Sequence, residues 1–208
     1  MINKHFCVPI LVEDNFCMDD IPAMKKVIDN EVKPNNTLDA HIQTTHGTNQ
    51  QLFQHSEFNN FNQAMLEKSF HFMKDLGYAG ENVGITNMWA NKVGKHDYHM
   101  PHVHGGAIVT GVYYLDAPKD AKINFSTASY DLEIHPEEQT EYNETKVSYD
   151  CKPGRLILFK GTTTMSQIDS TLLHEILKYN PDTGIFTWNK KISRKNVVGK
   201  TAGCLRSG

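Results

Sequence analysis

The sequence predicts a mostly β domain, a sandwich or a barrel, with a cover of α-helices. Two observations carry this prediction. From residue 83 onward, short apolar segments recur about every ten residues and are separated by turn-rich stretches such as Ala117-Pro118-Lys119-Asp120. Before them lie two segments with helical periodicity. Short strands that follow helices are typical of a sheet structure with one helical layer.

The helical segments have recognisable starts and stops. Asp19-Asp20-Ile21-Pro22 offers carboxylates for an N-cap and a proline in the first turn of a helix that runs to about residue 32. Ser56 is expected to cap the second helix, and Gly77 stands where a left-handed C-cap is wanted. The second helix has an apolar stripe that should cover one face of a sheet: Phe58, Phe61, Met65, Leu66, Phe70, Met73 and Leu76.

The strands are expected at residues 6–12, 84–91, 107–115, 121–125, 130–134, 145–149 and 155–159, with residues 33–50 forming a long surface loop. Composition fits a globular chain, because 39% of the residues are apolar and 22% are charged. No apolar run approaches the roughly 18 residues of a membrane-spanning helix, and the N-terminus has no cleavage signal, so a cytoplasmic location is the default expectation. The four scattered cysteines are expected to be free thiols.

Four of the eleven histidines, His96, His99, His102 and His104, lie within nine residues, directly before the expected strand 107–115. In an extended segment, residues two apart point to the same side, so His102 and His104 can converge on one ion. Imidazole pairs suit Fe, Zn, Cu or Ni. The cluster alone is also compatible with a solvated polar loop.

Trp89-Ala90-Asn91, His99-x-x-His102-x-His104 and Thr110-Gly111-Val112-Tyr113-Tyr114-Leu115 together resemble the Fe(II)/2-oxoglutarate-dependent oxygenases of marine phages and bacteria. Phe6-Cys7-Val8-Pro9-Ile10 and Pro153-Gly154-Arg155-Leu156-Ile157-Leu158-Phe159 extend this resemblance over about residues 1–161. It implies a double-stranded β-helix of the jelly-roll or cupin type, a hydroxylase-type oxygenase activity, and the cofactors Fe(II) and 2-oxoglutarate.

By this resemblance, His102 falls on the first metal-ligand position and His104 replaces the usual carboxylate, so Zn or Ni would also fit a recombinant preparation. Asn87, Asn91 and Tyr114 are expected to line the cofactor pocket. Trp89 is expected in the core, and His99 behind the ligands or at the surface.

The family pattern stops after Gly161. It calls for a distal metal-binding histidine and, about ten residues later, an arginine for 2-oxoglutarate, whereas the chain reads Thr162-Thr163-Thr164-Met165-Ser166-Gln167. We therefore expect a barrel that lacks its last strand and is impaired in activity, and we assign no catalytic residue. His174, His135 and His99 remain as alternative ligands.

The C-terminal stretch differs in charge and in resemblance. Residues 165–208 hold 7 Lys/Arg against 3 Asp/Glu, whereas residues 1–164 hold 14 against 21. Residues 172–188 and 198–203 resemble the start of phage-type HNH homing endonucleases, as a helix, a turn and a Phe-Thr-Trp strand. We therefore expect an oxygenase-like domain over residues 1–161 and a foreign fragment over residues 162–208.

Three expectations about partners follow. The basic residues of the tail should form a solvated face without specific nucleic-acid binding. An open sheet edge or the tail should favour a homodimer. The substrate, a small molecule or a protein, is not encoded in a local motif. Two functions stand beside an oxygenase: a non-enzymatic cupin-like binder of a metal or small ligand, and a nucleic-acid-binding fragment that acts through the tail.

Overall fold

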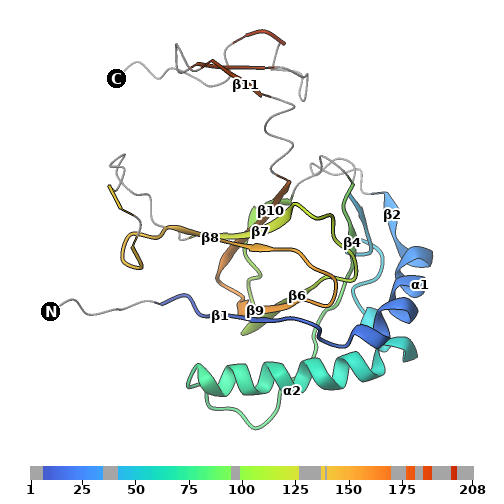
Figure 1. Ribbon diagram of the computed structural model, residues 1–208. Helices are drawn as coiled ribbons and strands as arrows, with labels where there is room; N and C mark the ends of the chain where they lie inside the picture. Colours follow the sequence, from blue (N-terminus) through green and yellow to red (C-terminus); the bar gives the residue numbers. More distant parts are fainter. Residues whose placement is uncertain are drawn as a thin grey trace, which may run out of the picture.

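The computed structural model describes residues 7–34, 42–94, 99–126, 137–138, 140–169, 177–180, 185–188 and 198–200. Two antiparallel sheets face one another, and a long helix lies along the outer face of one of them (Figure 1). One sheet has the order β1 (Ile10–Glu13), β9 (Leu156–Lys160), β6 (Val109–Tyr113). The other has the order β5 (His99–His102), β10 (Thr164–Asp169), β7 (Ala121–Ser126), β8 (Lys146–Asp150).

Strand β9 is buried on both of its faces and divides the core into two layers. Leu156 and Leu158 pack with the helices, whereas Ile157 and Phe159 point toward the opposite sheet. This follows from the side-chain alternation of a strand. The outer layer contains Met24, Ile28, Phe58, Phe61 and Phe72, and the layer between the sheets contains Ala121, Ile123, Phe125 and Met165.

The two expected helices are present, but their caps differ from the prediction. Helix α1 (Ile21–Glu31) follows the short 3-10 turn η1 (Met18–Asp20), and helix α2 (Asn59–Asp75) follows η2 (Leu52–Gln54) and η3 (Ser56–Phe58). Neither Asp20 nor Ser56 makes a side-chain cap hydrogen bond, because a 3-10 turn leads into each helix and occupies the cap position. Gly77 ends α2 with φ +78°, as expected.

A third, smaller sheet corrects two sequence predictions. Strand β3 (Gln43–Thr44) lies between β2 (Lys33–Pro34) and β4 (Asn91–Lys92), so the expected loop 33–50 contains two short strands. The expected strand 84–91 is irregular up to β4, apart from a bridge between Met88 and Gln51. Within this segment, Ala90 is hydrogen-bonded to Thr45. The Thr45 N–H donates to the Ala90 carbonyl, and the Ala90 N–H donates to Thr45 Oγ1. The expected strand 130–134 lies outside the described residues.

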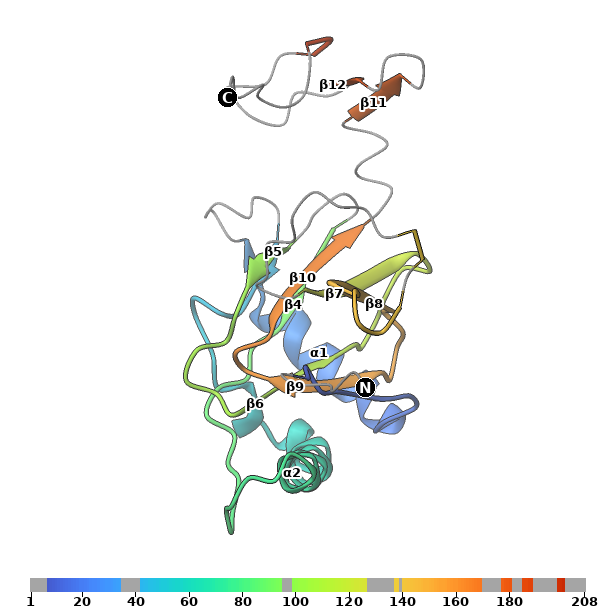
Figure 2. The same cartoon turned by 90° about the vertical axis from the view of Figure 1, so that its left-hand side faces the viewer.

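The sheet continues across the domain boundary expected at residue 161. Strand β10 runs to Asp169, between β5 and β7 (Figure 2), so the segment that departs from the family pattern still supplies a strand. Thr164 and Ile168 of this strand favour the extended conformation, because β-branched residues pack well on a pleated sheet. Among the described residues both large sheets keep open edges, at β5 and β8 in one and at β1 and β6 in the other.

Beyond β10, strands β11 (Leu177–Asn180) and β12 (Ile185–Trp188) pair with each other and with no strand of the two large sheets. The strand expected at Phe186-Thr187-Trp188 is confirmed. The helix expected before it is not continued at Leu177 and Lys178, which lie in β11. The origin of this segment stays a prediction. Of the helices that the structure describes, none is long and apolar enough to span a membrane. Cys7, Cys17 and Cys151 form no disulfide, as expected, and Cys204 lies outside the described residues.

Candidate metal site

Three of the clustered histidines, His99, His102 and His104, lie in or just after β5, beside β10, and His96 lies outside the described residues. His102 pairs with Met165 and His99 with Gln167, so a spacing of three residues on β5 faces a spacing of two on β10. This irregularity is a β-bulge, a feature that re-aims side chains and is common beside functional sites. In a regular strand, residues three apart point to opposite faces. Because of the bulge, the imidazoles of His99 and His102 lie close together, with their ring centroids 5.2 Å apart.

The rings of His102 and His104 lie 5.0 Å apart at 74° to each other, as the spacing of two residues predicts. Both side chains are half-buried. On its other side, the His104 ring lies 5.5 Å from Trp89 and 6.4 Å from Phe159. The pair therefore stands at the rim of the space between the two sheets, beside an aromatic wall.

His46 is a member of this cluster that sequence reasoning missed. Its ring lies 5.2 Å from Trp89, on which His104 also packs. Trp89 is consequently half-buried between two imidazoles and not in either core layer, which corrects the expectation of a core tryptophan. The signal for His46 is the pairing of β3 with β4, which brings residue 46 close to residue 89 and which no local motif announces.

A backbone clamp fixes His104. Its N–H donates to the Gly161 carbonyl at 2.8 Å, and its carbonyl accepts from Ala107 N–H at 3.3 Å. A Cβ atom on Gly161 would lie 2.2 Å from the Ala107 oxygen and 2.5 Å from the His104 oxygen. Only glycine permits this approach, so the turn between β9 and β10 determines where the His104 imidazole stands.

A hydrogen-bonded chain orients His99. The Thr44 hydroxyl donates to Asn91 Oδ1 at 2.5 Å, which leaves the Asn91 amide nitrogen to donate to His99 Nε2 at 3.2 Å. The Nε2 lone pair of His99 is thereby engaged by the protein. Among the sequence-predicted roles, this geometry favours a positioning role for His99 and gives Asn91 the task of holding it.

Burial lowers the pKa of His104, and the neighbouring His102, His99 and His46 lower it further. Metal ions bind the neutral form of imidazole. The cluster therefore keeps the His104 ring in its ligating form at a pH where a solvated histidine would be partly charged.

The other two predicted cofactor residues lie in different surroundings, and their role stays a prediction. Asn87 is exposed. Tyr114, directly after β6, is buried in the layer between the sheets with Phe159 and Met165, and burial strongly raises the pKa of the Tyr114 hydroxyl. His174 and His135 lie outside the described residues.

A row of side chains leads from His102 into the interior. Met165 pairs with His102 on one side and with Phe125 on the other, and directly opposed residues share a face of the sheet. Phe125 and Met165 belong to the layer between the sheets, together with Phe159. On the facing sheet, Thr110 pairs with Phe159, and its buried hydroxyl has no hydrogen-bond partner.

Part of the sequence matches a known protein family. Residues 87–183 match the model of the family described as "Putative 2OG-Fe(II) oxygenase". The match contains the histidine cluster and extends past residue 161 through β10 and β11. No curated protein matches the chain.

Among solved structures, the chain is similar to a prolyl-4-hydroxylase of Pseudomonas putida, with a TM-score of 0.52 and 12% sequence identity. The alignment covers 77% of this chain and 84% of the hydroxylase. This likeness shows the fold, a double-stranded β-helix with helical cover, as the sequence predicts. The family match supports the oxygenase interpretation, and the description of that family refers to 2-oxoglutarate and Fe(II).

The donor set of the described residues does not fit that iron centre. Non-haem Fe(II) oxygenases hold the metal with two histidines and one carboxylate. Here the pair is His102 and His104, and across the described ranges no three His, Cys, Asp or Glu side chains converge to share an ion. The position next to His102 on the neighbouring strand is a methionine.

Proposed function

We propose that this chain is an oxygenase-type metalloprotein in which His102 and His104 bind a transition metal, and in which turnover of 2-oxoglutarate is strongly reduced. The observation that carries the proposal is the His102–His104 pair, two half-buried imidazoles 5.0 Å apart at the rim of a double-stranded β-helix.

The residues around the pair have separable tasks. Gly161 holds the His104 backbone, Asn91 orients His99 behind the pair, and Trp89 walls the site against solvent. Such outer groups fix ring orientation and ligand basicity. These surrounding groups hold the His102 and His104 imidazoles in place before a metal binds, whereas the histidines of a solvated loop would be free to rotate.

The proposed loss of turnover concerns the co-substrate as well as the third ligand. Arg155 is the one arginine of the chain's three that the structure describes, and it donates to both carboxylate oxygens of Asp14 and to the Asp150 carbonyl. It is therefore occupied by structural bonds. The buried hydroxyls of Thr110 and Tyr114 have no hydrogen-bond partner in the described part of the chain, and a ligand's carboxylate could use them.

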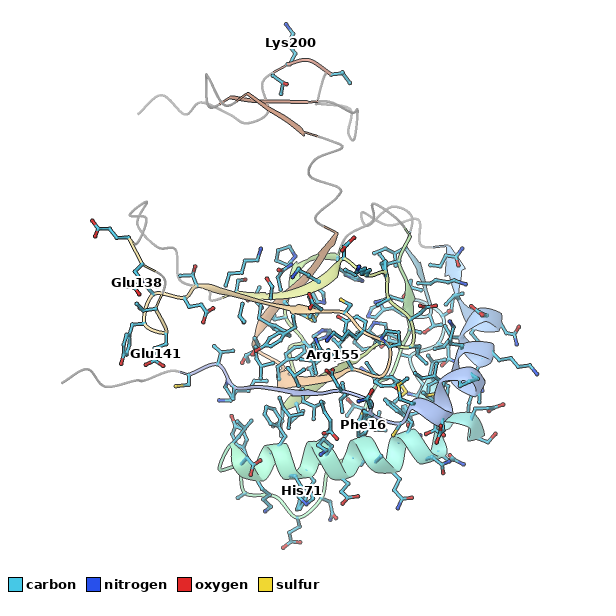
Figure 3. All side chains as sticks on the ribbon, in the orientation of Figure 1. Phe16, His71, Glu138, Glu141, Arg155 and Lys200 are labelled. Carbon is cyan, nitrogen blue, oxygen red and sulfur yellow. The ribbon has the colours of Figure 1, made fainter. Side chains whose placement is uncertain are left out.

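Metal binding and turnover are measured separately on the full chain. Titration with Ni(II) or Zn(II), followed calorimetrically, should give one site that His102→Ala and His104→Ala each abolish. His71→Ala is the matched control, because His71 is exposed on α2 and points away from the sheets (Figure 3). Equal affinity in His102→Ala and in His71→Ala would refute the assignment.

Turnover is read as succinate formed from 2-oxoglutarate with Fe(II) and O₂. We expect succinate at a low rate that still exceeds the rate of a metal-free control. Robust succinate formation would show a complete oxygenase with a ligand supplied from elsewhere in the chain. Binding without turnover matches the non-enzymatic alternative, a cupin-like metal binder. Nucleic-acid binding through the basic tail remains a prediction, to be tested by the salt dependence of DNA binding.

A further inference from the structure

The residue that completes the histidine pair differs in chemistry from what an iron oxygenase needs. A third ligand would come from β10, the strand hydrogen-bonded to β5, at the position opposite His102. That position is Met165. We infer that His102, His104 and Met165 form a soft-donor site that binds Cu(I) in preference to Fe(II). This inference rests on the proposed function, since it assumes that the histidine pair binds metal.

The register places the thioether beside the imidazoles. Directly opposed residues of an antiparallel pair have Cβ atoms about 4.5–5.5 Å apart and side chains on one face. Met165 is 6% exposed and packs between the sheets with Phe125 and Phe159, while His104 lies 6.4 Å from the same Phe159 ring. A methionine side chain has three rotatable bonds, so its sulfur can reach an ion held by the pair without moving the backbone.

The donor chemistry selects the metal. Thioether sulfur is a soft ligand that suits Cu(I), and imidazole suits copper as well, whereas Fe(II) oxygenase centres use a carboxylate in the third position. Among the described residues, no Asp or Glu joins the pair in a group of three that could share an ion. Two imidazoles and one thioether carry no charge, so a monovalent ion bound by them keeps a net charge of one and a divalent ion a net charge of two. Burying the doubly charged complex in a partly apolar setting costs more free energy.

The test is a competition titration of the full chain under anaerobic conditions, with bicinchoninate as the competing Cu(I) chelator and ferrozine as the competing Fe(II) chelator. The wild-type chain should take Cu(I) from bicinchoninate and lose Fe(II) to ferrozine. Met165→Leu keeps volume and apolarity while removing the sulfur, a swap that cores tolerate well. It should weaken Cu(I) binding by about tenfold or more, the loss typical of an impaired metal site.

Met24→Leu is the matched control, because Met24 is also buried but lies in the outer core layer with the helices. It should leave Cu(I) affinity unchanged. X-ray absorption at the copper edge adds a readout that does not depend on a variant. The wild-type spectrum should contain one sulfur neighbour among nitrogen neighbours, and Met165→Leu should lack it.

The outcomes separate the two proposals. If neither Cu(I) nor Ni(II) binds the wild-type chain, the proposed function fails. If metal binds through His102 and His104 but Met165→Leu retains full Cu(I) affinity and the spectrum contains no sulfur, the proposed function stands and the soft-donor site is wrong. Tighter retention of Fe(II) than of Cu(I) would likewise overturn this inference alone.

Discussion

Replacing Gly161 with alanine should weaken metal binding at the candidate site, although Gly161 is not itself a proposed ligand. The new Cβ would lie 2.2 Å from the Ala107 oxygen and 2.5 Å from the His104 oxygen. Ordinary non-bonded contacts are about 3.5 Å, so the loop that carries His104 must retreat by roughly 1 Å. His104 is tied to the same turn through its N–H bond to the Gly161 carbonyl, so its imidazole cannot stay where it is.

A displacement of this size matters because metal ligands must be placed within about 0.2 Å of their preferred distances. We expect metal affinity to fall by about 10–100-fold, as when a supporting group around a metal site is lost. Overpacking of this kind costs about 1–3 kcal/mol in the free energy of unfolding. In a chain of this size, each kcal/mol lowers the melting temperature by about 2–4 °C.

Calorimetric titration with Ni(II) measures the affinity, and thermal unfolding measures the stability. Gly105→Ala is the matched control, because Gly105 follows His104 directly and a Cβ there would have no atom within 4 Å. It should bind metal as the wild-type chain does. If Gly161→Ala binds equally well while Gly105→Ala does not, the clamp is not what positions His104.

Three further predictions concern other parts of the structure. Asp14→Asn should reduce the loss of unfolding free energy at acid pH. The hydrogen bond from Arg155 lowers the pKa of the Asp14 carboxyl, so in the wild-type chain this carboxylate stabilises the fold above about pH 4 and the stabilisation is lost as the pH falls further. Urea unfolding at several pH values would detect the difference. Phe61→Ala should cost about 3–5 kcal/mol in urea unfolding, because Phe61 is buried with its ring 4.7 Å from Tyr113, and metal affinity should be unchanged. Asn91→Leu should remove the hydrogen bond to His99 Nε2 and lower Ni(II) affinity by about tenfold; an unchanged calorimetric titration would exclude Asn91 as a positioning residue.

The parts of the fold that sequence predicts well have strong local periodicity. Most of the predicted stripe of the second helix is buried or packs against the core, although Phe72 is buried outside the stripe and Leu66 and Phe70 are only partly buried. The apolar run at residues 155–159 identifies strand β9. Gly77 marks the end of α2, because a left-handed residue is required there. In each case the physical cause, helical or strand periodicity or a positive φ, lies within a few residues of the element it determines.

What the sequence does not reveal is long-range pairing. His46 lies in a polar stretch without periodicity and reaches Trp89 because β3 pairs with β4. The Thr162–Gln167 segment departs from the family pattern, and its residues from Thr164 onward form β10 because β5 and β7 offer it hydrogen-bonding edges on both sides. Neither outcome has a local signature, since both depend on which strands become neighbours.

The third-ligand question has the same character. From sequence, the search is for a histidine at a plausible separation, which selects His174 and His135. In the folded sheet, the strand register determines which β10 residue shares a face with His102. That residue is Met165, whatever its chemistry. A shift of one residue along β10 would have turned Met165 toward the opposite face and removed it from the core layer that contains Phe125 and Phe159. The burial of Met165 therefore supports the register, and the register in turn makes the chemistry of this one side chain decisive for which metal the pair can hold.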